Sequence, residues 1–295
     1  MRTLTRLVAF AVLVALPVSA QVAKPDTSAK KEPPPIADNS FLVEEAYNQE
    51  FGVVQHISSF QRSREGSWVY SFTQEWPAPA QRLQFSYSIA VVNPNVTTGV
   101  QTPAGPVTSR KIGAGIGDLA INFRWQAIGK DEEPLWFSPR LSLLLPTGDY
   151  RDGHGAGGPG LELNLPLSYQ VSDAIVTHWN VGGNMIAGRN SLNMEGSTRN
   201  VRAGASAIWL LMPTFNFMLE TVAGRFESLD DSGKRVATNS FLISPGVRGA
   251  INFASGLQIV PGIAVPIGVG PNSGQRDLLL YLSFEHPFRK LEPPH

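Results

Sequence analysis

Short segments in which apolar and polar side chains alternate constrain this chain more than any other feature. The clearest covers residues 159–171, where every second residue from Leu161 to Leu167 is a leucine, while Glu162 and Asn164 stand between them. Successive side chains of a β-strand point to opposite faces, so this segment has one apolar and one polar face. The pattern predicts β-sheet rather than helix.

The alternation recurs along most of the chain, and the links between segments switch between short turns and longer loops. A tilted strand needs about 9–11 residues to cross a bilayer, and bacterial outer-membrane barrels have short periplasmic turns and longer outer loops. We therefore predict an all-β fold, a transmembrane antiparallel β-barrel of about 12 strands. The expected strands are 51–61, 67–76, 81–92, 118–127, 135–145, 159–171, 175–187, 200–211, 215–226, 241–253, 257–267 and 277–288, and the expected outer loops are 93–116, 146–158, 188–199, 227–239 and 268–275.

The composition of the two faces favours a membrane barrel over a soluble one. In a soluble sandwich or lipocalin-type barrel the apolar face points inwards and the polar face meets water. Here the polar face is small and rich in Ser, Asn, Gln and Gly, and the apolar face carries aromatic residues near the strand ends, as in the aromatic girdles of membrane barrels. These aromatic residues are Trp68, Trp76, Trp125, Trp179, Trp209, Phe284 and Phe288.

The N-terminus indicates export. Arg2 and Arg6 precede an apolar run from Leu7 to Leu16, and small residues end at Ala20, which is typical of a signal peptide cleaved before Gln21. We expect four regions: a signal peptide (1–20), a periplasmic linker with a helical turn or two near 38–47 (21–47), the barrel (48–288) and a periplasmic tail (289–295). The expected location is the outer membrane of a Gram-negative bacterium.

Composition excludes several classes of function. The chain has 24 Lys and Arg against 24 Asp and Glu, which gives no support for a nucleic-acid partner. The absence of cysteine excludes disulfides and thiolate metal sites. The glycines at 113, 115 and 117 precede a strand rather than a helix, so they do not indicate a dinucleotide loop. His154 has no second ligand beside it. We expect no metal and no cofactor.

Charged and amide side chains on the polar faces are the candidate functional residues. They are expected to point into the barrel, where they either pair across strands to stiffen the interior or form charge rings that tune a pore. Both interpretations remain open. The candidate lumen-lining residues are Glu75, Asp118, Asn122, Arg124, Arg140, Glu162, Asn164, His178, Arg202, Glu220, Arg248, Asp277 and Glu285.

Two motifs resemble a bacterial envelope family. The segment Gly-Ile-Gly-Asp-Leu-Ala-Ile-Asn at 115–122 is similar to its Gly-x-Gly-Asp-Leu strand entry, and Pro-Thr-Gly-Asp at 146–149 is similar to its turn. Residues 38–56 also resemble the start of such proteins. The family is described as "Putative MetA-pathway of phenol degradation", or as a transporter. The resemblance implies an outer-membrane barrel that passes small or aromatic molecules, and it brings no catalytic residues.

These observations predict a channel for passive or facilitated diffusion of small solutes, aromatic ones among them, through a narrow polar lumen. Its expected partners are outer-membrane lipid, the solutes and, during biogenesis, the barrel-assembly machinery. We further expect residues 21–47 to lie near the periplasmic mouth and restrict passage. The alternative is a non-transporting barrel, either structural or a lipid-active hydrolase. His178 is the best candidate residue for hydrolysis, but no nucleophile elbow or triad accompanies it. An exported soluble β protein is the third interpretation.

Overall fold

The computed structural model describes residues 39–102, 105–130 and 133–287. The chain divides into two units, Met1–Glu32 and Pro33–His295, and every described residue belongs to the second. The predicted signal peptide, most of the linker, Phe288 and the tail therefore lie outside the described residues. No helix in the described ranges is long and apolar enough to cross a membrane.

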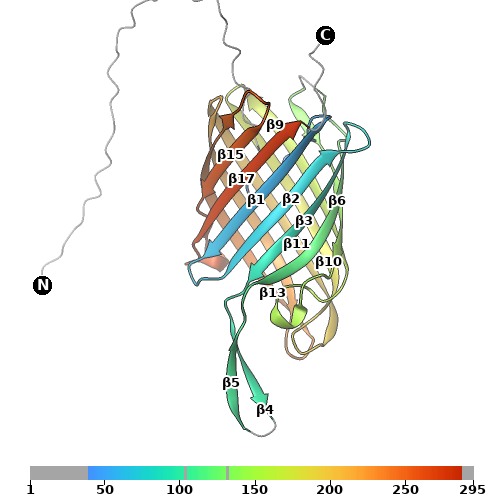
Figure 1. The fold of residues 1–295 in the computed structure, drawn as a ribbon, viewed down its shortest axis with the longest axis vertical. Helices are drawn as coiled ribbons and strands as arrows, with labels where there is room; N and C mark the ends of the chain where they lie inside the picture. Colours follow the sequence, from blue (N-terminus) through green and yellow to red (C-terminus); the bar gives the residue numbers. More distant parts are fainter. Residues whose placement is uncertain (1–38, 103–104, 131–132, 288–295) are drawn as a thin grey trace, which may run out of the picture. The chain divides into compact units, whose positions relative to one another are not determined.

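The described chain folds into a closed antiparallel β-barrel (Figure 1). Its main sheet contains 15 strand segments, of which three are short continuations of a neighbouring wall strand: β7 of β8, β14 of β13 and β16 of β15. Subtracting these leaves the 12 wall strands that the sequence predicts. The segments are β1 (Val53–Ser63), β2 (Trp68–Pro77), β3 (Leu83–Asn93), β6 (Gly115–Trp125), β7 (Leu135–Phe137), β8 (Arg140–Leu145), β9 (Gly160–Ser172), β10 (Ile175–Arg189), β11 (Glu195–Met212), β12 (Phe215–Leu229), β13 (Arg235–Gly249), β14 (Ile251–Asn252), β15 (Gln258–Ala264), β16 (Ile267–Gly268) and β17 (Asp277–Pro287).

The barrel closes where the last strand meets the first. β17 pairs with β1 over its whole length, from Val53 opposite Pro287 to Ser63 opposite Asp277, and β15 pairs with both β13 and β17. A closed sheet has no free edge, so every wall strand has a neighbour on each side. That condition allows a sheet to lie in hydrocarbon, where unpaired backbone groups would be very costly.

The distribution of side chains is the reverse of that in a soluble protein. Leu161 and Leu163 on β9 are 57% and 49% exposed, whereas Asn164 between the strand's outward leucines is fully buried. Serine, asparagine and arginine make up much of the buried set, and large apolar residues dominate the exposed set. Because outward apolar surface of this extent is stable only in lipid, the chain is an outer-membrane barrel.

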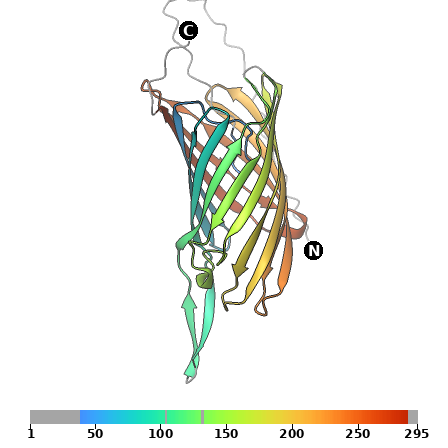
Figure 2. The same ribbon diagram turned by 90° about the vertical axis from the view of Figure 1, so that its right-hand side faces the viewer.

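The outer loops differ from the prediction. β10 continues to Arg189 and β11 begins at Glu195, and β12 and β13 extend in the same way, so the predicted loops 188–199 and 227–239 reduce to turns at 190–194 and 230–234 (Figure 2). Asn193 and Gly233 adopt left-handed conformations in these turns. The predicted loop 93–116 contains a separate hairpin, β4 (Thr97–Thr102) and β5 (Gly105–Lys111). Strand ends with solvent on both faces need no apolar alternation, so the pattern could not reveal them.

The predicted helical turn near 38–47 was also wrong. The described residues from Asn39 to Tyr47 contain bends but no helix. A capped helix start is expected from the sequence here, because Asn39 and Ser40 are good N-cap types and Glu44 and Glu45 suit the positive end of a helix. Instead, the backbone amides that would begin such a helix donate to side chains of the barrel.

Candidate functional site

The polar lumen and the segment that lies in it form the candidate site. We define the lumen segment as residues 39–49, directly before β1. Its hydrogen-bond partners Gln84, Ser168, Asn180, Ser206 and Glu220 come from five wall strands, and each lies within a few residues of a strand end at the short turns. The lumen segment therefore lies inside the half of the barrel next to the short turns. The part of the predicted mouth segment before residue 39 lies outside the described residues.

One carboxyl group anchors the start of this segment. Oε1 of Glu220 on β12 accepts hydrogen bonds from the backbone amides of Phe41, Leu42 and Val43, at 3.1, 2.7 and 3.0 Å. The Glu220 side chain is completely buried. A single acceptor thus satisfies three consecutive amides that would otherwise be buried without a partner. These three bonds reach the backbone, so they do not require particular side chains at 41–43.

Further wall side chains bind the rest of the segment's backbone. Asn180 accepts from the amide of Glu44 at 2.8 Å and donates to its carbonyl at 2.7 Å. Ser168 accepts from the amide of Ala46 at 2.8 Å, and Ser138 donates to the Ala46 carbonyl. These residues replace the partners that a helix or sheet would supply, which explains how an irregular segment can be buried.

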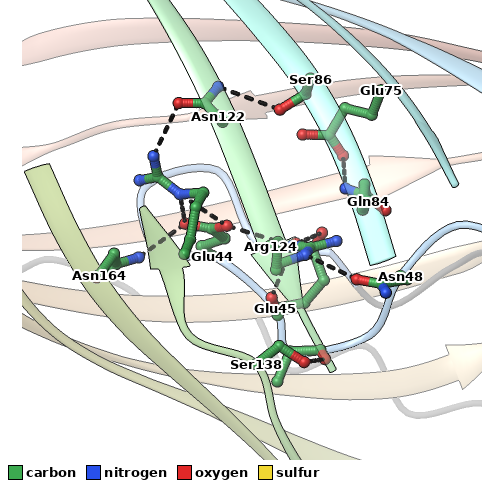
Figure 3. Close-up of polar contacts among 12 residues, drawn as sticks. Glu44, Glu45, Asn48, Glu75, Gln84, Ser86, Asn122, Arg124, Ser138 and Asn164 are labelled. Carbon is green, nitrogen blue, oxygen red and sulfur yellow. Dashed lines mark hydrogen bonds and ion pairs between the residues drawn. The ribbon is translucent and has the colours of Figure 1, made fainter. Parts of the chain in front are cut away.

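An ionic cluster lies beside this backbone network, as Figure 3 shows around Glu44. Glu44 pairs with Arg140 at 2.8 Å and with Arg124 at 3.2 Å, and Arg140 also pairs with Glu162 at 2.8 Å. Arg202 extends the cluster to Glu162 at 3.1 Å. Burial alone would raise the pKa of the Glu44 carboxyl, but the guanidinium groups of Arg140 and Arg124 outweigh it and hold this pKa below its ordinary value of 4.5.

Apolar packing holds the other side of the segment. The ring of Phe41 lies 5.0 Å from that of Tyr281, beside an inward cluster of Val260, Ala264 and Leu279. A Cβ at Gly262 would come within 2.4 Å of the Phe41 ring, and one at Gly246 within 2.9 Å. The wall on the side of β13, β15 and β17 is thus shaped around Phe41. This wall thus adds an apolar patch to a lumen in which Arg248 and Asp277 of the same wall are also buried.

At the outer end, the two motifs that resemble the envelope family touch each other. Asp118 of the Gly-x-Gly-Asp-Leu motif accepts from the amide of Gly148, in the Pro-Thr-Gly-Asp turn, at 3.0 Å and from that of Ala156 at 2.7 Å. Thr147 donates to the carbonyl of Gly117 at 2.8 Å. Loop 146–158 is thereby tied to the inner face of β6. Its residues 150–153, 155 and 156 line a cavity of about 510 Å³ together with residues of β10–β12.

The structure places the predicted lumen residues in three groups. The first group contacts the lumen segment directly or belongs to its ionic cluster. It consists of Asn122, Arg124, Arg140, Glu162, Asn164, Arg202, Glu220 and Arg248. Glu75, Asp277 and Glu285 pair with glutamines of neighbouring strands. Asp118 ties the outer loop. Whether any of them lines a solute's path remains a prediction.

His178 lies where hydrolysis is hard to support. Its Nδ1 is 2.7 Å from Oγ of Ser168, and both residues are fully buried. The same Ser168 hydroxyl accepts the Ala46 amide, and the Tyr47 ring lies edge-on to the imidazole at 5.8 Å. The pair is therefore covered by the lumen segment and holds it in place.

Several functional residues had no sequence signal. These residues occupy ordinary polar positions of the alternation, and only their hydrogen bonds to the lumen segment distinguish them from other polar residues. They are Gln84, Ser138, Ser168, Asn180 and Ser206. Trp136 also differs from the other tryptophans, since its ring packs against Tyr47 at 5.2 Å. Contacts between residues so distant in sequence cannot be read from periodicity.

Comparisons with known proteins agree with this architecture. The family model described as "Putative MetA-pathway of phenol degradation" matches residues 64–265. Among solved structures, the COG4313 outer membrane channel from Pseudomonas putida F1 has a TM-score of 0.53 at 12% identity and covers 82% of this chain and 97% of its own. The NanC porin has a TM-score of 0.45 at 10% identity and covers 78% of this chain and 98% of its own. The TodX deltaS2S3 mutant monoaromatic hydrocarbon channel has a TM-score of 0.41 at 10% identity and covers 81% of this chain and 91% of its own. No curated protein matches the sequence.

Proposed function

We propose that this chain, which belongs to the family described as "Putative MetA-pathway of phenol degradation", is an outer-membrane channel for passive diffusion of small solutes and that its lumen segment restricts the passage. The observation that carries the proposal is the reversed distribution of side chains, with apolar residues outwards and a hydrogen-bonding lumen inside. Such a wall encloses a polar route through hydrocarbon.

The lumen segment gives the proposal its second part. It fills the lumen near the short turns, while the outer cavity of about 510 Å³ remains. The contacts that hold it are hydrogen bonds, ion pairs and the packing of Phe41, and the polar contacts can be exchanged for contacts with water. A solute that enters from outside would therefore reach the segment and pass when it is displaced.

Single-channel conductance in planar bilayers tests both parts. We expect the full chain to conduct weakly, and a chain that lacks residues 39–48 to conduct several times more, because the segment's volume is returned to the lumen. A chain that lacks residues 24–33 has a similar length and should behave like the full chain. Folded barrels that carry no current with or without the segment would refute the channel, and equal currents would refute only the restriction.

The class of solute is inferred from the family and from the lumen. The apolar patch formed by Val260, Leu279 and Tyr281 faces hydrogen-bonding groups, which suits small molecules with both apolar and hydroxyl parts, aromatic ones included. Liposome uptake of phenol compared with a sugar of similar size measures this preference. Faster uptake of the sugar would contradict it.

A filled lumen favours a second candidate, a barrel with a structural role in the envelope. The bilayer experiment separates the two, since a structural barrel would not conduct even without residues 39–48. A lipid-active hydrolase has less support, because the Ser168–His178 pair is fully buried. We also expect lipid to cover the outward leucines, and the barrel-assembly machinery to insert the chain.

A further inference from the structure

Two histidines face each other on the outer surface of the barrel, where the first and last strands meet. His56 lies on β1 and His286 on β17. Each neighbours a residue that points inwards, since Gln55 and Glu285 join by a hydrogen bond of 2.6 Å inside the barrel. Because side chains of a strand alternate, both imidazoles point outwards. They are diagonal neighbours in the register, as His56 lies opposite Phe284 and His286 opposite Val54.

The distance between the two rings suits metal coordination. Their Nε2 atoms are 3.3 Å apart and their ring centroids 5.4 Å apart. Two nitrogens that each lie about 2.0–2.1 Å from one tetrahedral ion are about 3.3–3.4 Å apart. The pair therefore has the spacing of two ligands of one ion. Without an ion, a hydrogen bond between the two Nε2 atoms depends on the tautomer of each ring.

The surroundings allow an ion to reach this pair. Outward rings continue from His286 and His56 to Phe72 at 6.0 Å, Tyr87 and Trp76 on β2 and β3. This row lies near the short turns and corresponds to the aromatic girdle, which lies at the level of the lipid headgroups. Water and ions are present at that level, unlike in the hydrocarbon core.

We propose that His56 and His286 form a binding site for a divalent transition-metal ion that joins the first and last strands. Imidazole is a ligand that Zn²⁺, Ni²⁺ and Cu²⁺ accept, whereas Mg²⁺ and Ca²⁺ prefer oxygen. Within the described residues, no group of three or more His, Cys, Asp or Glu side chains gathers around one point. The ion would thus have two protein ligands, and water would complete its coordination.

Binding at this position would stabilise the closed barrel. A ligand that binds the folded state alone shifts the folding equilibrium towards it. The two ligands belong to strands at opposite ends of the barrel sequence, which adjoin only when the barrel has closed. The proposal does not depend on conduction, so it can fail or hold independently of the proposed channel.

Titration of the untagged, folded full chain with ZnCl₂ in detergent tests the site by calorimetry. We expect one Zn²⁺ per chain, and affinity at least about tenfold weaker in His56→Gln and in His286→Gln, because each loses one of two ligands. His154→Gln removes a histidine of the outer loop and should bind like the unchanged chain. The Cu²⁺ EPR spectrum of the unchanged chain should show two nitrogen ligands.

Two variants and a second measurement keep the proposal open to refutation. Heat-dependent mobility on a detergent gel shows whether each variant is folded, and Zn²⁺ should raise the unfolding temperature of the unchanged chain but not of either variant. If the unchanged chain binds no Zn²⁺, or if both folded variants bind it as tightly, the site does not exist.

Discussion

At the scale of single residues, Glu220 anchors the start of the lumen segment. Its Oε1 is the shared acceptor for three amides, so its loss leaves three buried donors without a partner. Each net hydrogen bond contributes about 0.5–1.5 kcal/mol, so Glu220→Ala should weaken docking by roughly 2–4 kcal/mol. We expect higher conductance, with long open periods in single-channel records.

Glu195 provides the matched control for Glu220. It forms an exposed ion pair with Arg189 at the outer end of β10 and β11, far along the strand from the lumen segment. Glu195→Ala should leave conductance unchanged, since exposed pairs contribute about 0–1 kcal/mol. Similar records from both glutamate variants would show that charge, rather than anchoring, controls the current.

Glu44 makes docking sensitive to acid. Its pKa is lower in the folded protein than its ordinary value of 4.5, because Arg140 and Arg124 stabilise the carboxylate. A lowered pKa stabilises docking at pH values above 4.5, and this stabilisation is lost as the pH falls through the lowered pKa. We expect conductance to be steady from neutral pH to about 4.5 and to rise below it. Glu44→Gln should conduct at pH 7 as the unchanged chain does in acid, and a pH profile identical to that of the unchanged chain would contradict this.

At the scale of elements, the Asp118 carboxylate anchors loop 146–158, and Thr147 adds a bond to the Gly117 carbonyl. Asp118 binds the amides of Gly148 and Ala156, and a Cβ at Gly155 would come within 2.3 Å of the Asp118 carboxylate. The close approach explains why glycine stands at 155 and why the two motifs occur together. Sequence showed the motifs, but it could not show that they contact each other.

Removal of this contact should release the loop. We predict that Asp118→Ala increases tryptic cleavage after Arg151 by about tenfold or more, since losing two hydrogen bonds of about 0.5–1.5 kcal/mol each raises the open population. Asp173→Ala removes an exposed acid of the short turn between β9 and β10, at the other end of the barrel, so cleavage after Arg151 should stay slow. Equal cleavage of both variants would show that Asp118 does not fix the loop.

At the scale of the whole molecule, the sequence specified the fold better than the site. Alternation such as that of Leu161, Leu163 and Leu165 predicted the wall strands, because side chains that face lipid must be apolar. It failed at 188–199 and 227–239, where both strand faces meet water. It also failed at the lumen segment, whose conformation depends on Glu220 and other wall residues far away in sequence.

The membrane location leads to a prediction of its own. Leu163 lies outwards on β9 and is 49% exposed. Leu163→Arg should destabilise the barrel by about 2–4 kcal/mol in vesicles, the cost of a cation near the bilayer midplane. Ser71→Arg places the same charge on the inner face of β2 and should cost much less. Urea unfolding of both variants measures the difference, and equal costs would indicate that Leu163 does not face hydrocarbon.

The partners of the lumen segment come from many strands, and this sets an order of assembly. Its partners lie on strands from β3 to β17, so its binding site does not exist until nearly the whole wall has formed. The lumen segment precedes every described strand in the sequence, yet it can dock only after the last strands have formed. On the proposed function, we expect a barrel whose lumen segment has not yet docked to conduct more than the mature one, so docking would complete its maturation.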